Sequence, residues 1–165
     1  MSDYRRPDVT SATVFFTVAL AQRGSGLLVS EIARLRTAVR ATKAERPFAI
    51  DAWVVLPDHL HAVWTLPMGD ADFSTRWRLI KSRFSRGVPK ARTRASHDAR
   101  CERGIWQRRF WEHHIRNEAD YWAHVRYCWM NPVKHGLVER PQDWRYSSVH
   151  RDARFQSDMD LMMPG

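Results

Sequence analysis

The sequence predicts an α+β fold: a ferredoxin-like βαββαβ antiparallel sheet with helices packed on one face, plus a C-terminal helix that carries a tyrosine. Two observations predict this class. Segments rich in β-branched and aromatic residues alternate with segments of helical periodicity, in the order strand, helix, strand, strand, helix, strand. That order matches the split βαβ arrangement, and the length of 165 residues suits one domain.

The first strand and the first helix follow from composition and spacing. Residues 13–20 (TVFFTVAL) are β-branched and aromatic, and they stop at a turn-like segment that contains two glycines. Apolar residues then recur with spacings of four, three and four, which predicts a helix that Ser30 caps and that ends before Pro47. The residues of this apolar stripe are Leu28, Ile32, Leu35 and Val39.

A hairpin and a second helix come next. Residues 48–56 (FAIDAWVVL) and 59–66 (HLHAVWTL) read as two strands, and the tight turn at Pro57-Asp58 joins them. The same rhythm of four, three and four then predicts a helix whose other faces are basic. Its apolar residues are Phe73, Trp77, Ile80 and Phe84.

The last third of the chain is less regular. Residues 86–104 are polar, basic and without pattern, which predicts a mobile surface loop. An aromatic stretch at 105–115 predicts a strand, and Asn117 caps a helix that is expected to run to about Met130, because Pro132 discourages its continuation. We expect one domain over residues 1–150 and a mobile tail over 151–165.

The charge of the chain is its most informative compositional property. Lysine and arginine total 27 against 18 aspartate and glutamate, a formal net charge of +9. Such an excess attracts polyanions, most often nucleic acid, although ribosome-associated and lipid-binding proteins share it. No apolar run approaches the roughly 18 residues of a membrane span, and the N-terminus lacks the apolar core of a secretory signal. We therefore expect a cytoplasmic, nucleoid-associated protein without membrane contact.

The tripeptide His59-Leu60-His61 is the sharpest local feature. Alternate residues of a strand face the same way, so both imidazoles are expected on one face with Leu60 opposite. Two imidazoles at this spacing can share one divalent metal ion. The same tripeptide also arises by chance in a histidine-rich sequence, so the motif alone leaves both interpretations open.

The helix from Asn117 provides a second polar set. Trp122, Val125 and Trp129 form its apolar stripe, and an opposite stripe has spacings of four, three and four. Such a stripe is ordinarily a solvated face, but a tyrosine is a poor surface residue and an asparagine could complete a His-His-Asn metal site. The stripe consists of Asp120, His124, Tyr127 and Asn131.

These residue types suit attack on a phosphodiester. A phenol has a pKa near 10 and needs assistance to act as a nucleophile. A metal ion held by His59, His61 and Asn131 could bind a phosphate oxygen while Tyr127 becomes linked to the 5′ phosphate and releases a 3′ hydroxyl. The ligand set is compatible with magnesium or manganese, and also with zinc. Tyr121 is the rival nucleophile but lies nearer the core edge.

The chain resembles the REP-associated tyrosine transposases, which belong to the HUH single-strand endonucleases. His59-Leu60-His61 matches the His-hydrophobic-His signature, and the block that ends in residues 131–136 (NPVKHG) is specific. The resemblance covers roughly residues 4–150. It implies a transposase and endonuclease that acts on single-stranded DNA with imperfect hairpins, the repetitive extragenic palindromes, through a phosphotyrosine intermediate. It also implies Tyr127 as the nucleophile, and His59, His61 and Asn131 as ligands of Mg²⁺ or Mn²⁺.

Further residues are expected to support the site or to contact DNA. Asp120 and His124 are expected to orient Tyr127 or a metal-bound water without binding the ion themselves. DNA contacts are expected from the N-terminal arginines, from the basic helix and from the aromatic stretch, namely Arg5, Arg6, Arg76, Lys81, Arg83, Arg108 and Arg109.

Other functions stay open on the sequence alone. The charge would also suit a non-catalytic protein that binds structured DNA and derives from such a transposase, or a nuclease directed at RNA. One tyrosine per chain suits either a monomer or a homodimer. The sequence does not determine which hairpin is recognised or whether the protein serves a mobile element or its host.

Overall fold

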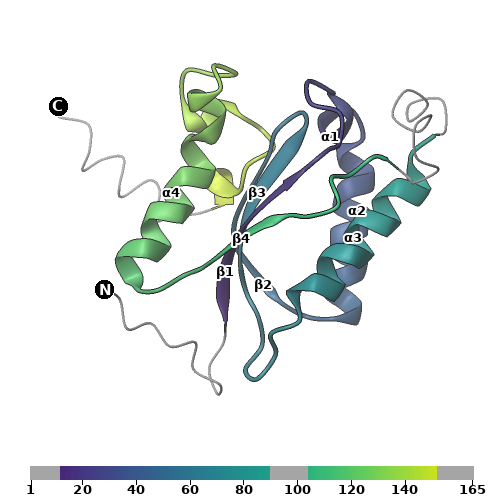
Figure 1. Cartoon of the computed structure of the whole chain (residues 1–165). Helices are drawn as coiled ribbons and strands as arrows, with labels where there is room; N and C mark the ends of the chain where they lie inside the picture. Colours follow the sequence, from purple (N-terminus) through teal and green to yellow (C-terminus); the bar gives the residue numbers. More distant parts are fainter. Residues whose placement is uncertain (1–11, 90–103, 152–165) are drawn as a thin grey trace, which may run out of the picture.

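A computed structural model describes residues 12–89 and 104–151 of the chain. Its centre is a four-stranded antiparallel sheet in the order β2-β3-β1-β4 (Figure 1). This is the strand order of the split βαβ arrangement, so the predicted α+β, ferredoxin-like fold is confirmed. The strands are β1 (Thr13–Ala19), β2 (Ala49–Val55), β3 (His59–Thr65) and β4 (Trp111–His114).

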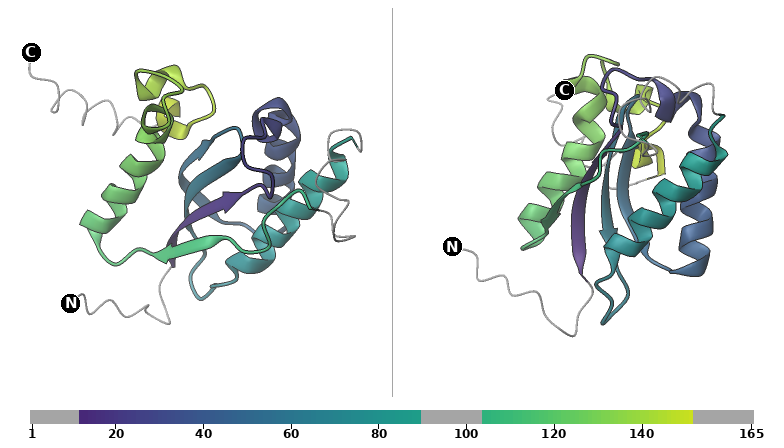
Figure 2. Two further views of the ribbon diagram at one scale, coloured as in Figure 1. Left: turned by 45° about the horizontal axis from the view of Figure 1, so that its top comes forward. Right: turned by 45° about the vertical axis from the view of Figure 1, so that its right-hand side comes forward.

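Helices cover both faces of this sheet. The short α1 (Leu27–Ser30) leads into α2 (Ile32–Glu45), which packs beside α3 (Phe73–Gly87) on one face, and α4 (Glu118–Lys134) lies on the other (Figures 1 and 2). Two 3-10 turns follow, η3 (Pro141–Asp143) and η4 (Ser148–Arg151). Within the described residues, no helix is both long and apolar enough to cross a membrane.

Strand alternation gives the protein two cores. Even-numbered residues of β1 and β3, such as Phe16 and Trp64, pack with α2 and α3. Odd-numbered residues such as Phe15 and Val63 face α4, where they pack with its Val125 and other buried residues. Because both faces of the sheet are covered, β3 is buried almost throughout, including its two histidines.

The C-terminal segment is tied to the free edge of β2. The amide of Val55 donates to the carbonyl of Tyr146 at 2.8 Å, and Val54 forms an isolated bridge with Ser147. A bulge at Asp51 interrupts the pairing of β2 with β3. The carboxylate of Asp51 accepts hydrogen bonds from Thr65 of β3 and Tyr121 of α4, so the bulge helps to fix α4 on the sheet.

The boundaries of two predicted elements were wrong. The helix expected around residues 28–39 is broken at Glu31, and Ser30 lies inside α1, where its hydroxyl donates to the Leu27 carbonyl instead of capping α2. The strand expected at 105–115 pairs only over Trp111–His114, with one isolated bridge between Leu20 and Trp106. An alternating pattern predicts an extended segment, but it does not show over how many residues that segment pairs with β1.

The end of α4 was also predicted wrongly. The helix continues through Pro132 to Lys134, and the chain turns only at Gly136, whose φ is +71°. Proline removes one backbone donor, yet the amide of His135 still donates to the Asn131 carbonyl at 3.0 Å. Because Pro132 is itself buried, packing holds the last turn helical, and this places Asn131 on the same helix as Tyr127.

Three predicted features fall largely outside the described residues. The basic loop expected at 86–104 begins later than predicted, because α3 extends to Gly87, and residues 90–103 are not described. The tail expected at 151–165 is described only at Arg151, which belongs to η4. Arg5 and Arg6 also lie outside the described parts of the chain.

Candidate active site

The two histidines of β3 lie under α4 with their rings 5.0 Å apart. His59 is 6% exposed and His61 3%, and each Nδ1 is held by an oxygen. The Asp58 carboxylate accepts from Nδ1 of His59 at 2.6 Å, and the hydroxyl of Thr17 lies 2.8 Å from Nδ1 of His61. Thr17 is the register partner of His61 across the β1–β3 ladder. With Nδ1 engaged, Nε2 is the atom that each ring can offer to a metal ion.

Buried polar atoms without partners mark the same place. Nε2 of His61 and both polar atoms of the Asn131 carboxamide are buried and have no hydrogen-bond partner among the described residues. An unsatisfied buried donor or acceptor costs about 1–3 kcal/mol, so such groups are rare unless another species binds them. An imidazole nitrogen and a carboxamide oxygen are both ligands of divalent cations. The residues present therefore fit a metal ion.

Tyr127 of α4 lies against this pair. Its ring centroid is 5.2 Å from that of His61 and 5.7 Å from that of Phe15, and it meets both rings edge-on. The side chain is 38% exposed, so the phenol can be reached from solvent. The Lys134 ammonium donates to the phenol oxygen at 3.4 Å and lies 5.0 Å from the ring centroid. A tyrosine hydroxyl, a cation and two histidines thus meet at one end of α4.

Electrostatics keep the histidines neutral. Burial lowers the pKa of His61 to about 3, and the nearby Lys134 ammonium acts in the same direction. Burial also lowers the pKa of His59, although the Asp58 carboxylate opposes the shift. Only a neutral imidazole has a lone pair for a metal ion, so His61 stays competent as a ligand well below neutral pH, and the lowered pKa of His59 favours its neutral form as well.

A second cluster joins β4 to the start of α4. His113, Asp120 and His124 bring one ligand atom each within 4.8 Å of one another, and they are half-buried. Nε2 of His113 lies 2.8 Å from one Asp120 oxygen, and the Arg116 amide donates to the same oxygen. Burial opposes ionisation of Asp120, but these hydrogen bonds outweigh it and hold the pKa of the carboxyl below its usual value. The donor types fit a divalent cation, as do those of the β3 histidines.

Comparison with proteins of known name decides the family. A REP-associated tyrosine transposase of Escherichia coli (strain K12) is 49% identical to this chain over 152 residues, which are 92% of this chain and 85% of the relative. The chain belongs to the REP-associated tyrosine transposases. As a member of this family it is a DNA-processing enzyme. A Haemophilus influenzae relative, provisionally given the same family name, is 41% identical over 93% of this chain and 89% of its own length.

Solved structures agree with this assignment. The structure of a REP-associated tyrosine transposase bound to a REP hairpin matches with a TM-score of 0.76 and 49% identity, over 93% of this chain and 86% of the other. A crystal structure provisionally described as a transposase from Deinococcus radiodurans, 12% identical, has a TM-score of 0.51 over 81% of this chain and 95% of its own, and supports the fold alone. No family model matches the sequence.

The structure brings the core of the predicted transposase site together. His59 and His61 share a face, Tyr127 contacts His61, and Asn131 is buried one turn further along α4. The stripe that contains Tyr127 is therefore not a solvated face. Tyr121, the rival nucleophile, packs between α4 and the sheet, with its hydroxyl 3.1 Å from Asp51.

Asp120 and His124 take a different position from the one expected. Their hydrogen bonds join them to each other and to β4, and the ring of Phe15 lies between His124 and Tyr127. Their role in orienting Tyr127 stays a prediction that this geometry does not directly support. His113 and His114 face opposite sides of the sheet, as strand alternation requires, so only His113 joins the cluster.

Arg76 was wrongly placed on the DNA-binding surface. It is 2% exposed, and its guanidinium donates to both carboxylate oxygens of Asp70 and to the carbonyls of Arg46, Pro47 and Asp72. All its hydrogen-bonding capacity is used within the protein, so it stabilises the fold. Helical periodicity placed it beside the apolar stripe but did not reveal the carboxylate of Asp70, six residues earlier and outside the helix.

The other residues predicted to contact DNA differ in whether their charge is already engaged within the protein. The Lys81 ammonium donates to the Gln107 carbonyl and lies over two aromatic rings, and burial lowers its pKa. Arg83 is bound to Glu45 and to the Thr42 hydroxyl. Arg108 and Arg109 are exposed.

Sequence reasoning missed the groups that hold the histidines. Asp58 precedes His59 directly, and its role could have been inferred from that adjacency. Thr17 lies 44 residues from His61, and only the strand register joins them. The contact of Lys134 with Tyr127 depends on the helix continuing through Pro132.

Proposed function

We propose that this transposase is a metal-dependent endonuclease and strand transferase for single-stranded DNA that forms imperfect hairpins. The single observation that carries the proposal is the Tyr127 ring set against His61, where a histidine nitrogen and the Asn131 carboxamide are buried without partners. The relative whose structure was solved with a REP hairpin supports repetitive extragenic palindromes as the substrate class.

His59, His61 and Asn131 would hold the metal ion, which we expect to be Mg²⁺ or Mn²⁺. When bound, such an ion supplies Lewis-acid stabilisation of the charge on a non-bridging phosphate oxygen. The Asp58 and Thr17 oxygens engage Nδ1 of each ring, which leaves Nε2 of each as the atom available to the ion. A His-rich ligand set also admits zinc, so the identity of the ion is to be found by titration.

Tyr127 is the proposed nucleophile. Its oxygen attacks the phosphorus, the bond from phosphorus to the 3′ oxygen breaks, and the products are a 5′-phosphotyrosine and a free 3′ hydroxyl. The phenol proton leaves to solvent, which reaches the 38% exposed side chain, and the departing 3′ oxygen takes a proton from solvent. The Lys134 ammonium, 3.4 Å from the phenol oxygen, stabilises negative charge that develops there. The reverse attack by a 3′ hydroxyl rejoins strands, because the phosphotyrosine bond retains the energy of the phosphodiester.

Substitution of the tyrosine tests the nucleophile. With Mn²⁺ and a labelled hairpin oligonucleotide, the wild-type protein should form a covalent adduct that survives denaturing electrophoresis. Tyr127→Phe should lose the adduct completely and bind the hairpin with unchanged affinity, because the phenol oxygen is needed only for the reaction. Tyr121→Phe, the matched control, should keep the adduct. Adduct formation by Tyr127→Phe would show that another group is the nucleophile.

The charge of the chain favours one alternative, a non-catalytic protein that binds structured DNA. A calorimetric titration with Mn²⁺ separates the two functions. The enzyme should bind Mn²⁺, and His61→Ala or Asn131→Ala should weaken this binding at least tenfold. The non-catalytic alternative predicts no Mn²⁺ binding at His59 and His61. A residual signal that instead disappears in His113→Ala would assign the ion to the cluster of His113, Asp120 and His124.

A further inference from the structure

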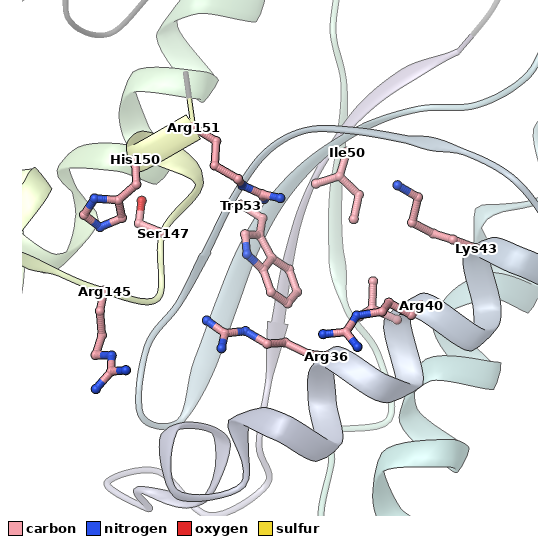
Figure 3. A pocket seen from close by; sticks show the side chains of 10 residues that line it. Arg36, Arg40, Lys43, Ile50, Trp53, Arg145, Ser147, His150 and Arg151 are labelled. Atoms are coloured by element: carbon pink, nitrogen blue, oxygen red, sulfur yellow. The ribbon is translucent and has the colours of Figure 1, made fainter. Parts of the chain in front are cut away.

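A basic pocket opens at the edge of β2, on the face of the sheet opposite to Tyr127. It has a volume of about 430 Å³, within the range of pockets that bind small organic ligands. Helix α2 provides one wall, β2 the floor and the segment around η4 the other wall (Figure 3). The residues that matter for its chemistry are Arg36, Arg40, Lys43, Trp53, Arg145 and Arg151.

The positive charge of this pocket is not compensated within the described residues. Arg36, Arg40 and Lys43 follow one another at spacings of four and three, so they share one face of α2. The acidic groups of the neighbourhood are engaged elsewhere: Glu31 pairs with Arg34 and Glu45 with Arg83. No ion pair within the described residues joins a carboxylate to the cations of the pocket. A cavity lined by like charges attracts a polyanion.

The wall opposite α2 is held in place. The Ser147 backbone bridges to Val54, and the Trp144 indole donates to the Val55 carbonyl at 2.9 Å. The Ser148 hydroxyl accepts from the backbone amide of Trp53 at 2.9 Å and from the indole of Trp129 at 3.2 Å. These bonds fix the segment that carries Arg145 and Arg151, so the site is formed before a ligand arrives.

An indole lies among these cations. Figure 3 shows the Trp53 ring at the centre of the pocket, with the guanidinium groups of Arg36, Arg40 and Arg151 around it. Trp53 is half-buried, unlike Trp64 and Trp77, which are buried in the core. A flat aromatic ring beside phosphate-binding cations is the combination with which proteins hold unpaired nucleic-acid strands.

We propose that this pocket is a second DNA-binding site, for an unpaired segment that flanks the hairpin. Backbone phosphates contact Arg36, Arg40 and Arg151, and a base stacks on Trp53. The site serves binding alone, because it lies across the sheet from Tyr127. It holds the strand without regard to sequence, since every base has a stacking face. This inference rests on the proposed function for its choice of DNA as the polyanion.

The direct test is fluorescence anisotropy of labelled (dT)12, which forms no hairpin, with the full chain at several salt concentrations. The double variant R36Q/R40Q should bind at least tenfold more weakly and lower the salt slope by about 1.4, two contacts at about 0.7 each. Trp53→Leu should bind about fivefold or more weakly with an unchanged slope. Arg34→Gln, on the same helix but in an exposed ion pair outside the pocket, should bind like wild type. Melting curves show that each variant folds.

The outcomes separate this inference from the proposed function. Wild-type affinity for (dT)12 in both pocket variants would overturn the site, and tighter binding of (rU)12 would overturn DNA as its ligand. A loss confined to R36Q/R40Q would overturn the stacking role of Trp53. Adduct formation with a hairpin that lacks flanking nucleotides should be unchanged in R36Q/R40Q. If Tyr127→Phe kept its adduct while the (dT)12 results held, the nucleophile would be wrong and the pocket right.

Discussion

Individual polar atoms distinguish the place where we propose the active site. Folded proteins satisfy most buried donors and acceptors, yet Nε2 of His61 and the Asn131 carboxamide have no partner among the described residues. The neighbouring atoms, by contrast, are firmly engaged: Thr17 and Asp58 hold the other nitrogen of each ring. The rings are thus held at Nδ1, while Nε2 of His61 and the Asn131 carboxamide are left available, as expected of a site that is ready to bind a ligand.

The buried His61 predicts how stability depends on pH. Its folded pKa of about 3 lies far below the unfolded value near 6.5, so the unfolded state binds a proton first as the pH falls. Its contribution is therefore fully present above about pH 6.5 and decreases toward pH 3, with a slope of up to about 1.4 kcal/mol per pH unit. In urea denaturation without metal between pH 7 and pH 4.5, His61→Asn should lose less stability on acidification than wild type.

A matched substitution isolates this effect from the titration of carboxylates. His114→Asn removes a histidine whose side chain is 33% exposed and pairs with Glu112 on the other face of the sheet. It should keep the wild-type dependence on pH. An equally steep loss in His61→Asn and in wild type would contradict a folded His61 that stays neutral.

Helix ends and the segments between elements determine which side chains meet. The continuation of α4 through Pro132 places Asn131 and Lys134 beside Tyr127. On the other face, Arg76 joins the first turn of α3 to the segment between α2 and β2, through the carbonyls of Arg46 and Pro47. One buried guanidinium thus connects α3 to the segment between α2 and β2 and to Asp70 in the segment before α3.

Replacement of Arg76 should therefore affect stability and not the DNA contact. Arg76→Gln leaves the Asp70 carboxylate and several carbonyls without their donor, which should lower the free energy of unfolding by about 2–4 kcal/mol. The exposed Arg78 on the same helix is the matched control, and Arg78→Gln should change stability by no more than about 0.5 kcal/mol. Urea denaturation measures both. Unchanged stability in Arg76→Gln, with weakened hairpin binding, would restore the role that the sequence suggested.

At the scale of the whole molecule, the two proposed sites lie on opposite faces of one sheet. The α4 face carries the tyrosine and the histidines, and the α2 face carries the basic pocket beside β2 (Figures 2 and 3). The net charge of the chain is +9, and among the described residues cations lie on both faces of the sheet, Lys134 on one and the pocket arginines on the other, so a DNA chain is attracted to more than one side of the protein.

This distribution predicts a salt dependence that single residues change unequally. The affinity for a hairpin oligonucleotide should fall linearly with the logarithm of salt concentration, because binding releases counterions. Arg109→Gln removes an exposed cation and should reduce the slope by about 0.9. Arg83→Gln removes a cation that is already paired with Glu45 and should leave the slope unchanged. Anisotropy at several KCl concentrations measures both, and equal slopes for the two variants would refute this ranking.

Much of the fold and of the site could be read from local pattern. Alternation in β3 put His59 and His61 on one face, and the capping Asn117 marked the start of α4, where its side chain accepts from the Asp120 amide at 2.8 Å. These features depend on neighbours in the chain. The polar stripe of α4 was harder to interpret, because periodicity gives the angle between side chains and not what lies opposite them.

The sequence by itself determined the order of the elements, the pairing of the two histidines and the family, since these rest on spacing and on residue identity along the chain. Only the tertiary structure decided that Arg76 is buried, that Thr17 holds His61, and that Arg36 and Arg151 share a pocket with Trp53. The physical reason is that burial and charge compensation depend on partners far away in the sequence. Strand register and helix packing bring these partners together.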